Sequence, residues 1–98
     1  MRRGTTQTIT ITTDVDLREA SNLFVTFKQG DLIVIEKTLE DVTVTGNKVV
    51  CELSQSDTLA LKDDVVVRFQ IRATIGDAKI ASNIMTTPVD EILKGGAI

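Results

Sequence analysis

The sequence predicts an all-β fold, an immunoglobulin-like sandwich of two antiparallel sheets with about seven strands. Two observations lead to this class. Threonine and β-branched aliphatic residues alternate with a period of two along most of the chain, and glycine-containing turns separate the runs at Gly30, Gly46 and Gly76. The length of 98 residues suits a single domain, residues 1–98, with one core.

The alternating runs place the expected strands at residues 6–13, 22–28, 31–37, 41–45, 48–53, 64–75 and 78–86. In an immunoglobulin-like order the second, third, sixth and seventh runs form one sheet, and the others form the second sheet. The sixth run alternates longest, which indicates a central strand with one buried face. The third run begins with apolar residues on both faces, which indicates a strand with neighbours. A small closed barrel and another Greek-key arrangement are the alternatives.

Two connections carry helix-capping patterns in place of hairpin turns. Residues 16–19 have the spacing Asp-x-x-Glu, and residues 54–57 have the spacing Ser-x-x-Asp. In each case the first side chain can accept a hydrogen bond from the backbone amide three residues later. We therefore expect short helical turns near residues 16–20 and 54–59, with Asp16 capping the amide of Glu19.

The segment after the last expected strand allows two interpretations. Thr87 can cap a helix, Pro88 suits the first helical position, and Gly95 can end the helix. This pattern favours a short helix over residues 87–94. The alternative continues the last strand at the edge of the sheet, where Pro88 is tolerated.

The composition argues against catalysis and against several classes of partner. No histidine is present, so the commonest general base and metal ligand are missing, and we expect neither enzymatic activity nor a cofactor. The formal net charge of −3 argues against nucleic acid as a partner. No apolar run approaches the roughly 18 residues of a membrane-spanning helix, and the basic start has no apolar segment of a secretory signal. The single cysteine, Cys51, is expected to be a small buried apolar residue.

Acidic side chains occur in pairs, all in expected turns or at strand ends, where carboxylates commonly cap turns and protect edges. Asp14 and Asp16 form an Asp-x-Asp pair that can contribute to a calcium site. A calcium loop needs more ligands than this pair supplies, so solvated turns are the preferred interpretation.

The surfaces most suited to binding a partner protein are the outer face of the sixth run and the exposed strand edges. Val66, Arg68 and Arg72 point away from the core in the alternating pattern, either as a solvent-exposed face or as a contact face for a partner. Arg2 and Arg3, in the polar start of the chain, can pair with the edge of a neighbour. We take these five residues as candidate partner contacts.

Several segments resemble small phage and prophage structural proteins of Gram-positive bacteria. They are residues 2–6 (Arg-Arg-Gly-Thr-Thr), 25–30 (Val-Thr-Phe-Lys-Gln-Gly), 53–59 (Leu-Ser-Gln-Ser-Asp-Thr-Leu), 81–84 and 91–94. The chain is also similar to the N-terminal β-sandwich domain of siphophage upper baseplate proteins. The resemblance covers nearly the whole chain and rests on turn and corner residues.

The resemblance implies a non-catalytic virion component, a tail or baseplate module that binds other virion proteins or further copies of itself. Its expected location is the virion, and the bacterial cytoplasm during assembly. The alternative is a small module that binds a host cell-surface receptor or cell-wall carbohydrate. The absence of Trp and Tyr argues against carbohydrate, because sugar rings stack on aromatic faces.

Overall fold

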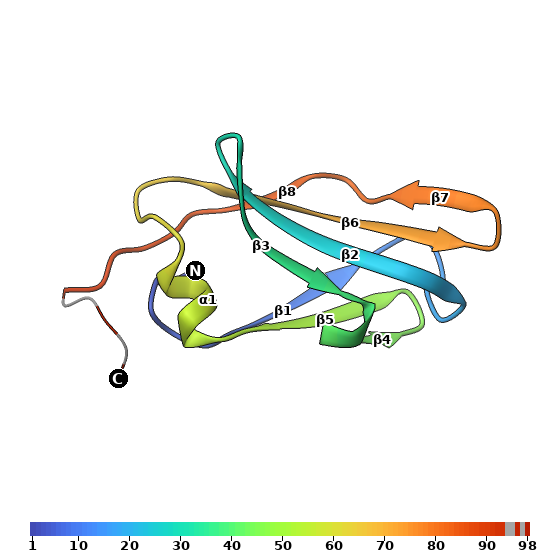
Figure 1. Cartoon of the computed structure of the whole chain (residues 1–98), viewed down its shortest axis with the longest axis horizontal. Coiled ribbons are helices and arrows are strands. Elements are labelled where there is room, and N and C mark those ends of the chain that lie inside the picture. Colours follow the sequence, from blue (N-terminus) through green and yellow to red (C-terminus); the bar gives the residue numbers. More distant parts are fainter. Residues whose placement is uncertain (94–95, 97) are drawn as a thin grey trace.

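The protein folds as a sandwich of two antiparallel β-sheets in a computed structural model that describes residues 1–93, 96 and 98 (Figure 1). The elements, in chain order, are β1 (Gln7–Thr12), β2 (Ala20–Gln29), β3 (Leu32–Thr38), η1 (Leu39–Asp41), β4 (Val42–Thr45), β5 (Lys48–Leu53), α1 (Gln55–Leu59), β6 (Val67–Ile75), β7 (Ala78–Ala81) and β8 (Met85–Thr87).

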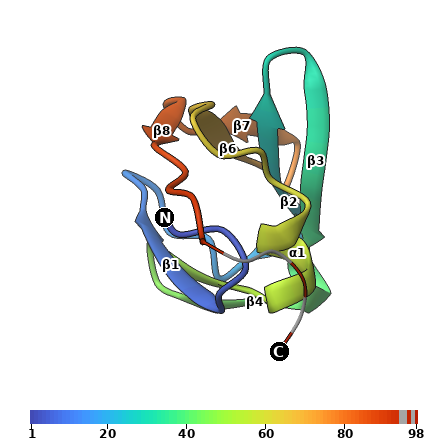
Figure 2. The ribbon, with the colours of Figure 1, turned by 90° about the vertical axis from the view of Figure 1, so that its left-hand side faces the viewer.

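The two sheets contain the strands that the sequence assigned to them. One sheet has the order β1-β5-β4, and the other has the order β3-β2-β6-β7, with β8 also pairing with β6. All named strand pairs are antiparallel. Figure 2 looks along the sandwich and shows the two layers facing each other. The predicted all-β sandwich is confirmed, including the expected division of the strands.

The core lies between the sheets and follows the period-two pattern of the sequence. Leu23, Val25 and Phe27 alternate inward along β2, and Phe27 stacks on Phe69 of β6 with ring centroids 5.4 Å apart. From the opposite sheet, buried residues of β1 and β5 pack against them. Cys51 of β5 is a free and fully buried thiol, as expected, and burial raises its pKa to about 11. Such a thiol packs as a small apolar side chain and stays protonated at neutral pH.

Glycine is required at three hairpin turns by the conformation of the backbone. Gly30, Gly46 and Gly76 adopt φ angles of 60°, 60° and 59°. A side chain at these positions would meet no atom within 4 Å, so space does not require glycine there. The left-handed backbone does, because a Cβ atom disfavours it. The three predicted hairpins are therefore confirmed.

Two predicted strands have different limits in the structure. The strand expected at residues 64–75 begins only at Val67, because Asp64 adopts a left-handed φ of 61° that extended backbone cannot include. The strand expected at 78–86 is divided into β7 and β8. Ser82, at the break, donates its backbone N–H to the carbonyl of Ile71, and its Oγ accepts the Ile71 N–H at 2.9 Å. The Ser82 hydroxyl thus accepts the Ile71 N–H in place of a backbone carbonyl, at the point where the chain leaves the sheet.

The third run of the sequence is an edge strand, with a neighbour on one side and not on both. Among the residues that the structure describes, β3 pairs only with β2. Its first residues, Leu32 and Ile33, are exposed. Figure 2 shows the β2–β3 hairpin projecting from the rest of the sandwich. A register shift in the β2–β3 ladder also marks this strand.

The corner after β5 forms the predicted helical turn, α1. Ser54 Oγ accepts from the Asp57 amide, and the Asp57 carboxylate accepts from the Ser54 amide at 2.8 Å. Lys37 of β3 adds an ion pair to Asp57 at 2.8 Å. Burial by itself would raise the pKa of Asp57, but the hydrogen bonds from Lys37 and Ser54 outweigh it and lower the pKa.

The corner after β1 is not the predicted helical turn. The Asp16 carboxylate accepts from the amide of Arg18, not from that of Glu19, and it also receives the Arg18 guanidinium. The backbone closes one tight turn through the Ala20 N–H and the Leu17 carbonyl, 3.1 Å apart. The helical expectation for residues 16–20 was wrong because the carboxylate is engaged two residues away.

The segment after β8 is not helical over residues 87–93, which corrects the favoured interpretation. Thr87 ends β8, and Val89 is buried in the core. Asp90 forms a parallel bridge with Arg2, and its N–H donates to the Met1 carbonyl at 2.7 Å. The extended backbone allows Val89 to be buried and Asp90 to pair with the start of the chain. These tertiary contacts outweigh the local preference for a capped helix. Lys94 and Gly95, the expected end of the helix, lie outside the described residues.

Candidate interaction surface

The outer face of the larger sheet carries two of the five predicted contact residues, Arg68 and Arg72, and a third, Val66, directly precedes their strand β6. Directly paired residues of neighbouring strands lie on the same face of a sheet. Arg68 of β6 pairs with Lys28 of β2, and Arg72 pairs with Phe24. Both arginines are exposed, which confirms the predicted alternation of β6.

Arg68 is held in place by the neighbouring hairpin. Its Nη2 donates to the carbonyl of Gly30 at 2.9 Å, which links β6 to the turn between β2 and β3. Val66 is 51% exposed and directly precedes β6, outside the strand. The arginine and the valine therefore mark the end of the sheet where the β2–β3 hairpin projects.

Apolar residues that the sequence pattern did not single out surround the cations. Ile33 pairs with Lys28 across the β2–β3 ladder and is 54% exposed. Ile84, between β7 and β8, is 58% exposed and lines a shallow depression with Lys28 and Arg68. We call this set, together with Val66 and Arg72, the outer-sheet surface. The apolar start of the third run was the only sequence signal for Ile33, and it was taken to indicate a strand with neighbours.

The outer-sheet surface is basic although the chain is acidic. The chain has a net charge of −3, yet Lys28 and Arg68 are directly paired across β2 and β6, and Arg72 lies on the same face further along β6. Glu36 of β3 is near them, because it pairs with Thr26. Exposed aliphatic residues beside arginine are common in protein–protein interfaces, and an acidic partner surface would complement the charge.

Arg2 and Arg3 lie away from this surface and make contacts within the chain. The Arg3 guanidinium donates to the carbonyls of Leu61 at 2.7 Å and Leu59 at 3.0 Å, at the carboxyl end of α1. Arg2 donates to the Glu91 carbonyl at 2.5 Å and lies beside Asp90. The start of the chain thus pairs with residues 88–90 of the same chain, and Arg3 stabilises a helix end.

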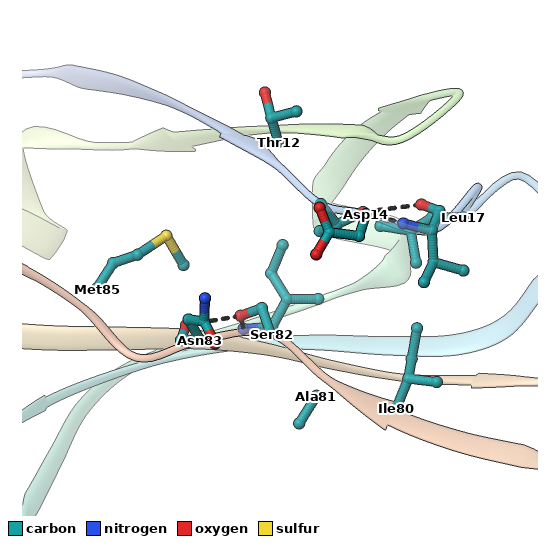
Figure 3. A pocket seen from close by; sticks show the side chains of 11 residues that line it. Thr12, Asp14, Leu17, Ile80, Ala81, Ser82, Asn83 and Met85 are labelled. Carbon is teal, nitrogen blue, oxygen red and sulfur yellow. Dashed lines mark hydrogen bonds between the residues drawn. The ribbon is translucent and has the colours of Figure 1, made fainter.

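A cavity of about 270 Å³ opens between the first corner and the β7–β8 segment (Figure 3). Its lining combines apolar residues such as Leu17 and Met85 with the polar residues Thr12, Asp14 and Asn83. Figure 3 shows Asp14 and Asn83 on opposite sides of the opening. The cavity provides hydrogen-bonding groups for a small ligand, but no aromatic ring on which a sugar could stack.

The acidic residues beside this cavity do not converge on one point. The Asp16 side chain is engaged by Arg18, whose hydrogen bonds lower its pKa. Among the described residues, no group of three or more acidic, cysteine or histidine side chains is arranged to hold a metal ion. The described part of the chain also contains no helix that is long and apolar enough to cross a membrane.

Comparisons with protein-family models, with curated proteins and with solved structures gave no match to this chain.

Proposed function

We propose that this chain is a non-catalytic structural component of a phage or prophage virion, a tail or baseplate module that binds other virion proteins through the outer-sheet surface. The observation that carries the contact role is the combination of exposed Ile33 and Ile84 with Lys28, Arg68 and Arg72 on one face, beside the exposed Val66 that precedes β6. The resemblance of residues 2–6, 25–30 and 53–59 to phage structural proteins supports the virion setting.

The physical basis of the proposed contact is burial of apolar area with charge complementarity. Covering the exposed aliphatic residues removes apolar surface from water, at roughly 25 cal/mol per Å². The adjacent cations would orient a partner with an acidic face and increase its association rate. The hydrogen bond between Arg68 and Gly30 fixes this part of the surface before binding, which lowers the entropy cost of association.

The test starts with particles. Virions purified from a host that produces them are analysed by mass spectrometry, and the chain is expected at a fixed ratio to the known tail proteins. Its absence from intact particles would contradict the virion role. A double charge reversal, Arg68→Glu with Arg72→Glu, is then expected to abolish incorporation. Lys48→Glu, on the exposed side of the other sheet, is the matched control and should be incorporated normally.

The second candidate function is a module that binds a host-surface receptor or cell-wall carbohydrate, and the cavity beside Asp14 favours it. In that case purified protein binds glycans or cell-wall fragments, and Asp14→Ala abolishes the binding. The same substitution leaves particle incorporation unchanged under the first proposal. The two functions are therefore separated by which variant, Asp14→Ala or the double arginine reversal, removes the activity.

A further inference from the structure

The four outer strand edges of the sandwich differ in how they are protected from pairing with another chain. The β3 edge has a register shift and the charged residues Glu36 and Lys37. The β7–β8 edge is interrupted at Ser82 and includes Lys79. The β4 edge is only four residues long. Bulges, charges, interruptions and short length are the usual means of preventing edge-to-edge association.

The β1 edge has none of these features. β1 extends over six residues, Gln7–Thr12, with the sequence QTITIT, and it contains no charged residue or proline. Its pairing with β5 is regular from Gln7–Leu53 to Thr12–Lys48. Figure 2 shows β1 at the side of the smaller sheet. A regular, uncharged edge strand of this length is a template for another β-strand.

The backbone groups available on this edge follow from one hydrogen bond. The N–H of Thr13 donates to the Asn47 carbonyl at 2.8 Å, so Thr13 faces β5. Backbone groups alternate in direction along a strand, and Ile9 and Ile11 therefore also face β5. Thr8, Thr10 and Thr12 direct their N–H and C=O groups to the open side. Their backbone groups bond to no other segment within the described part of the chain.

We propose that two copies of this chain associate through antiparallel pairing of their β1 strands, with Thr10 on the two-fold axis. This register places Thr8 opposite Thr12, and it forms three hydrogen-bonded pairs from the groups that face outward. Ile9 then lies opposite Ile11, so the apolar faces of the two copies align. An axis between two residues would set Ile opposite Thr, and an axis on Ile9 or Ile11 would form only two hydrogen-bonded pairs from the outward-facing groups of β1.

Charge supports a second copy as the occupant. On the outer face of β5, exposed Glu52 pairs with Thr8 and exposed Lys48 pairs with Thr12. Because the proposed register places Thr8 of one copy opposite Thr12 of the other, the acidic end of one β5 strand lies toward the basic end of the other copy's β5 across the self-complementary interface. The exposed threonines form cross-strand pairs on the outer face, which are favourable in antiparallel sheets. This inference rests on the β1 edge alone and stands apart from the proposed virion role.

The test compares two lysine substitutions in one row of the smaller sheet. Val50 of β5 pairs with Thr10 of β1 on one side and with Thr43 of β4 on the other, and both threonines are exposed. Sedimentation equilibrium of the full chain is expected to show a concentration-dependent dimer of twice 10.7 kDa. Thr10→Lys places like charges across the axis and should raise the dimer dissociation constant about tenfold or more. Thr43→Lys should leave it unchanged.

A mixture of variants separates loss of pairing from loss of folding. Thr10→Glu alone should also weaken the dimer, whereas an equimolar mixture of Thr10→Lys and Thr10→Glu should restore it, because opposite charges then meet across the axis. In the wild-type chain, hydrogen exchange at the amides of Thr8, Thr10 and Thr12 should slow as protein concentration rises. A strict monomer at all concentrations would overturn the proposal, as would a dimer that Thr43→Lys disrupts and Thr10→Lys does not.

Discussion

The corner after β1 and the corner after β5 carry similar capping patterns, yet only the second forms a helix. They lie at opposite ends of the sandwich (Figure 1). In the second corner, Ser54 and Asp57 exchange hydrogen bonds with each other's backbone amides. In the first, the Asp16 carboxylate is engaged by Arg18. Asp16 also accepts a backbone amide, but the one two residues later, whereas Ser54 and Asp57 each bond an amide three residues away. The capping pair therefore forms a helix only where its hydrogen bonds span three residues.

The two corners also depend on different interactions for stability. The first corner is anchored by the buried side chain of Leu17, which is 1% exposed. The second is anchored by polar contacts around α1, including buried Thr58, whose hydroxyl donates to the Thr5 carbonyl at 2.6 Å. Apolar burial therefore fixes one corner and a hydrogen-bond network fixes the other.

The largest effect is expected from Leu17→Ala in the first corner. Removing this buried side chain leaves a cavity and should lower the free energy of unfolding by about 3 kcal/mol. Urea unfolding monitored by circular dichroism measures the change. Val15→Ala, in the same corner but 41% exposed, is the control and should cost less than about 0.5 kcal/mol. Equal effects of the two would contradict an anchor at Leu17.

Thr58→Val in the second corner should have the next largest effect. Valine keeps the shape of the side chain but leaves the Thr5 carbonyl without its hydroxyl donor. Loss of a buried hydrogen bond predicts a decrease of about 1–2 kcal/mol in the free energy of unfolding, measured by the same urea titration. Thr8→Val, on the exposed face of β1, should be nearly neutral, and a similar loss there would rule out a specific role for the Thr58 hydroxyl.

Asp57→Asn tests the reciprocal cap and the pH dependence of the second corner. We expect a loss of about 1 kcal/mol at neutral pH, shared between the helix cap and the ion pair with Lys37, whose two side chains are only 21% and 24% exposed. The folded-state pKa of Asp57 is lowered from 3.8, so its contribution is complete above about pH 4 and is lost as the pH falls through the folded value.

The hydrogen bond from Asp57 raises the pKa of Lys37 above 10.5, so the lysine contributes fully below that pH and the contribution is lost at higher pH. Melting temperatures of wild type and Asp57→Asn should therefore differ most between about pH 4 and pH 10 and converge in acid. Glu36→Gln, on the same strand as Lys37, is the control. A difference that persists at pH 2 would contradict the assignment to the ionised carboxylate.

The smallest effect is expected from Arg18→Ala. The Arg18–Asp16 ion pair is exposed on both sides, with relative exposures of 68% and 50%, and such pairs add little to stability. We expect no resolvable change in melting temperature, and no gain of helical signal, because Leu17 still holds the turn in place. A helical gain in the circular dichroism spectrum would instead show that Arg18 alone prevents the cap.

The sequence predicted the features that local chemistry decides. Period-two alternation placed the strands, and left-handed glycines placed the three hairpins. Strand limits were less predictable where one residue changed the outcome. The left-handed Asp64 delays the start of β6, and Ser82 divides β7 from β8 by bonding to Ile71 through its side chain. Neither residue carries an unambiguous local signal for these roles.

The candidate surface was predictable only in part. Arg68 and Arg72 were identified because alternation along a central strand fixes which residues face outward. Ile33 and Ile84 were not, because their exposure depends on how far the β2–β3 hairpin projects and on where the last strand breaks. Arg3 was expected at a partner but caps α1 across 56 and 58 residues of sequence, a distance at which no local pattern is informative.

The sequence by itself determined the all-β class, the assignment of strands to the two sheets and the burial of Cys51, because side-chain alternation and turn conformation are properties of short segments. The tertiary structure alone decided which capping pair became a helix, that residues 88–90 pair with the start of the chain, and that β1 is left with a regular open edge. These features depend on which groups meet across the fold, and hydrogen bonds between distant segments outweigh the preferences of the local sequence.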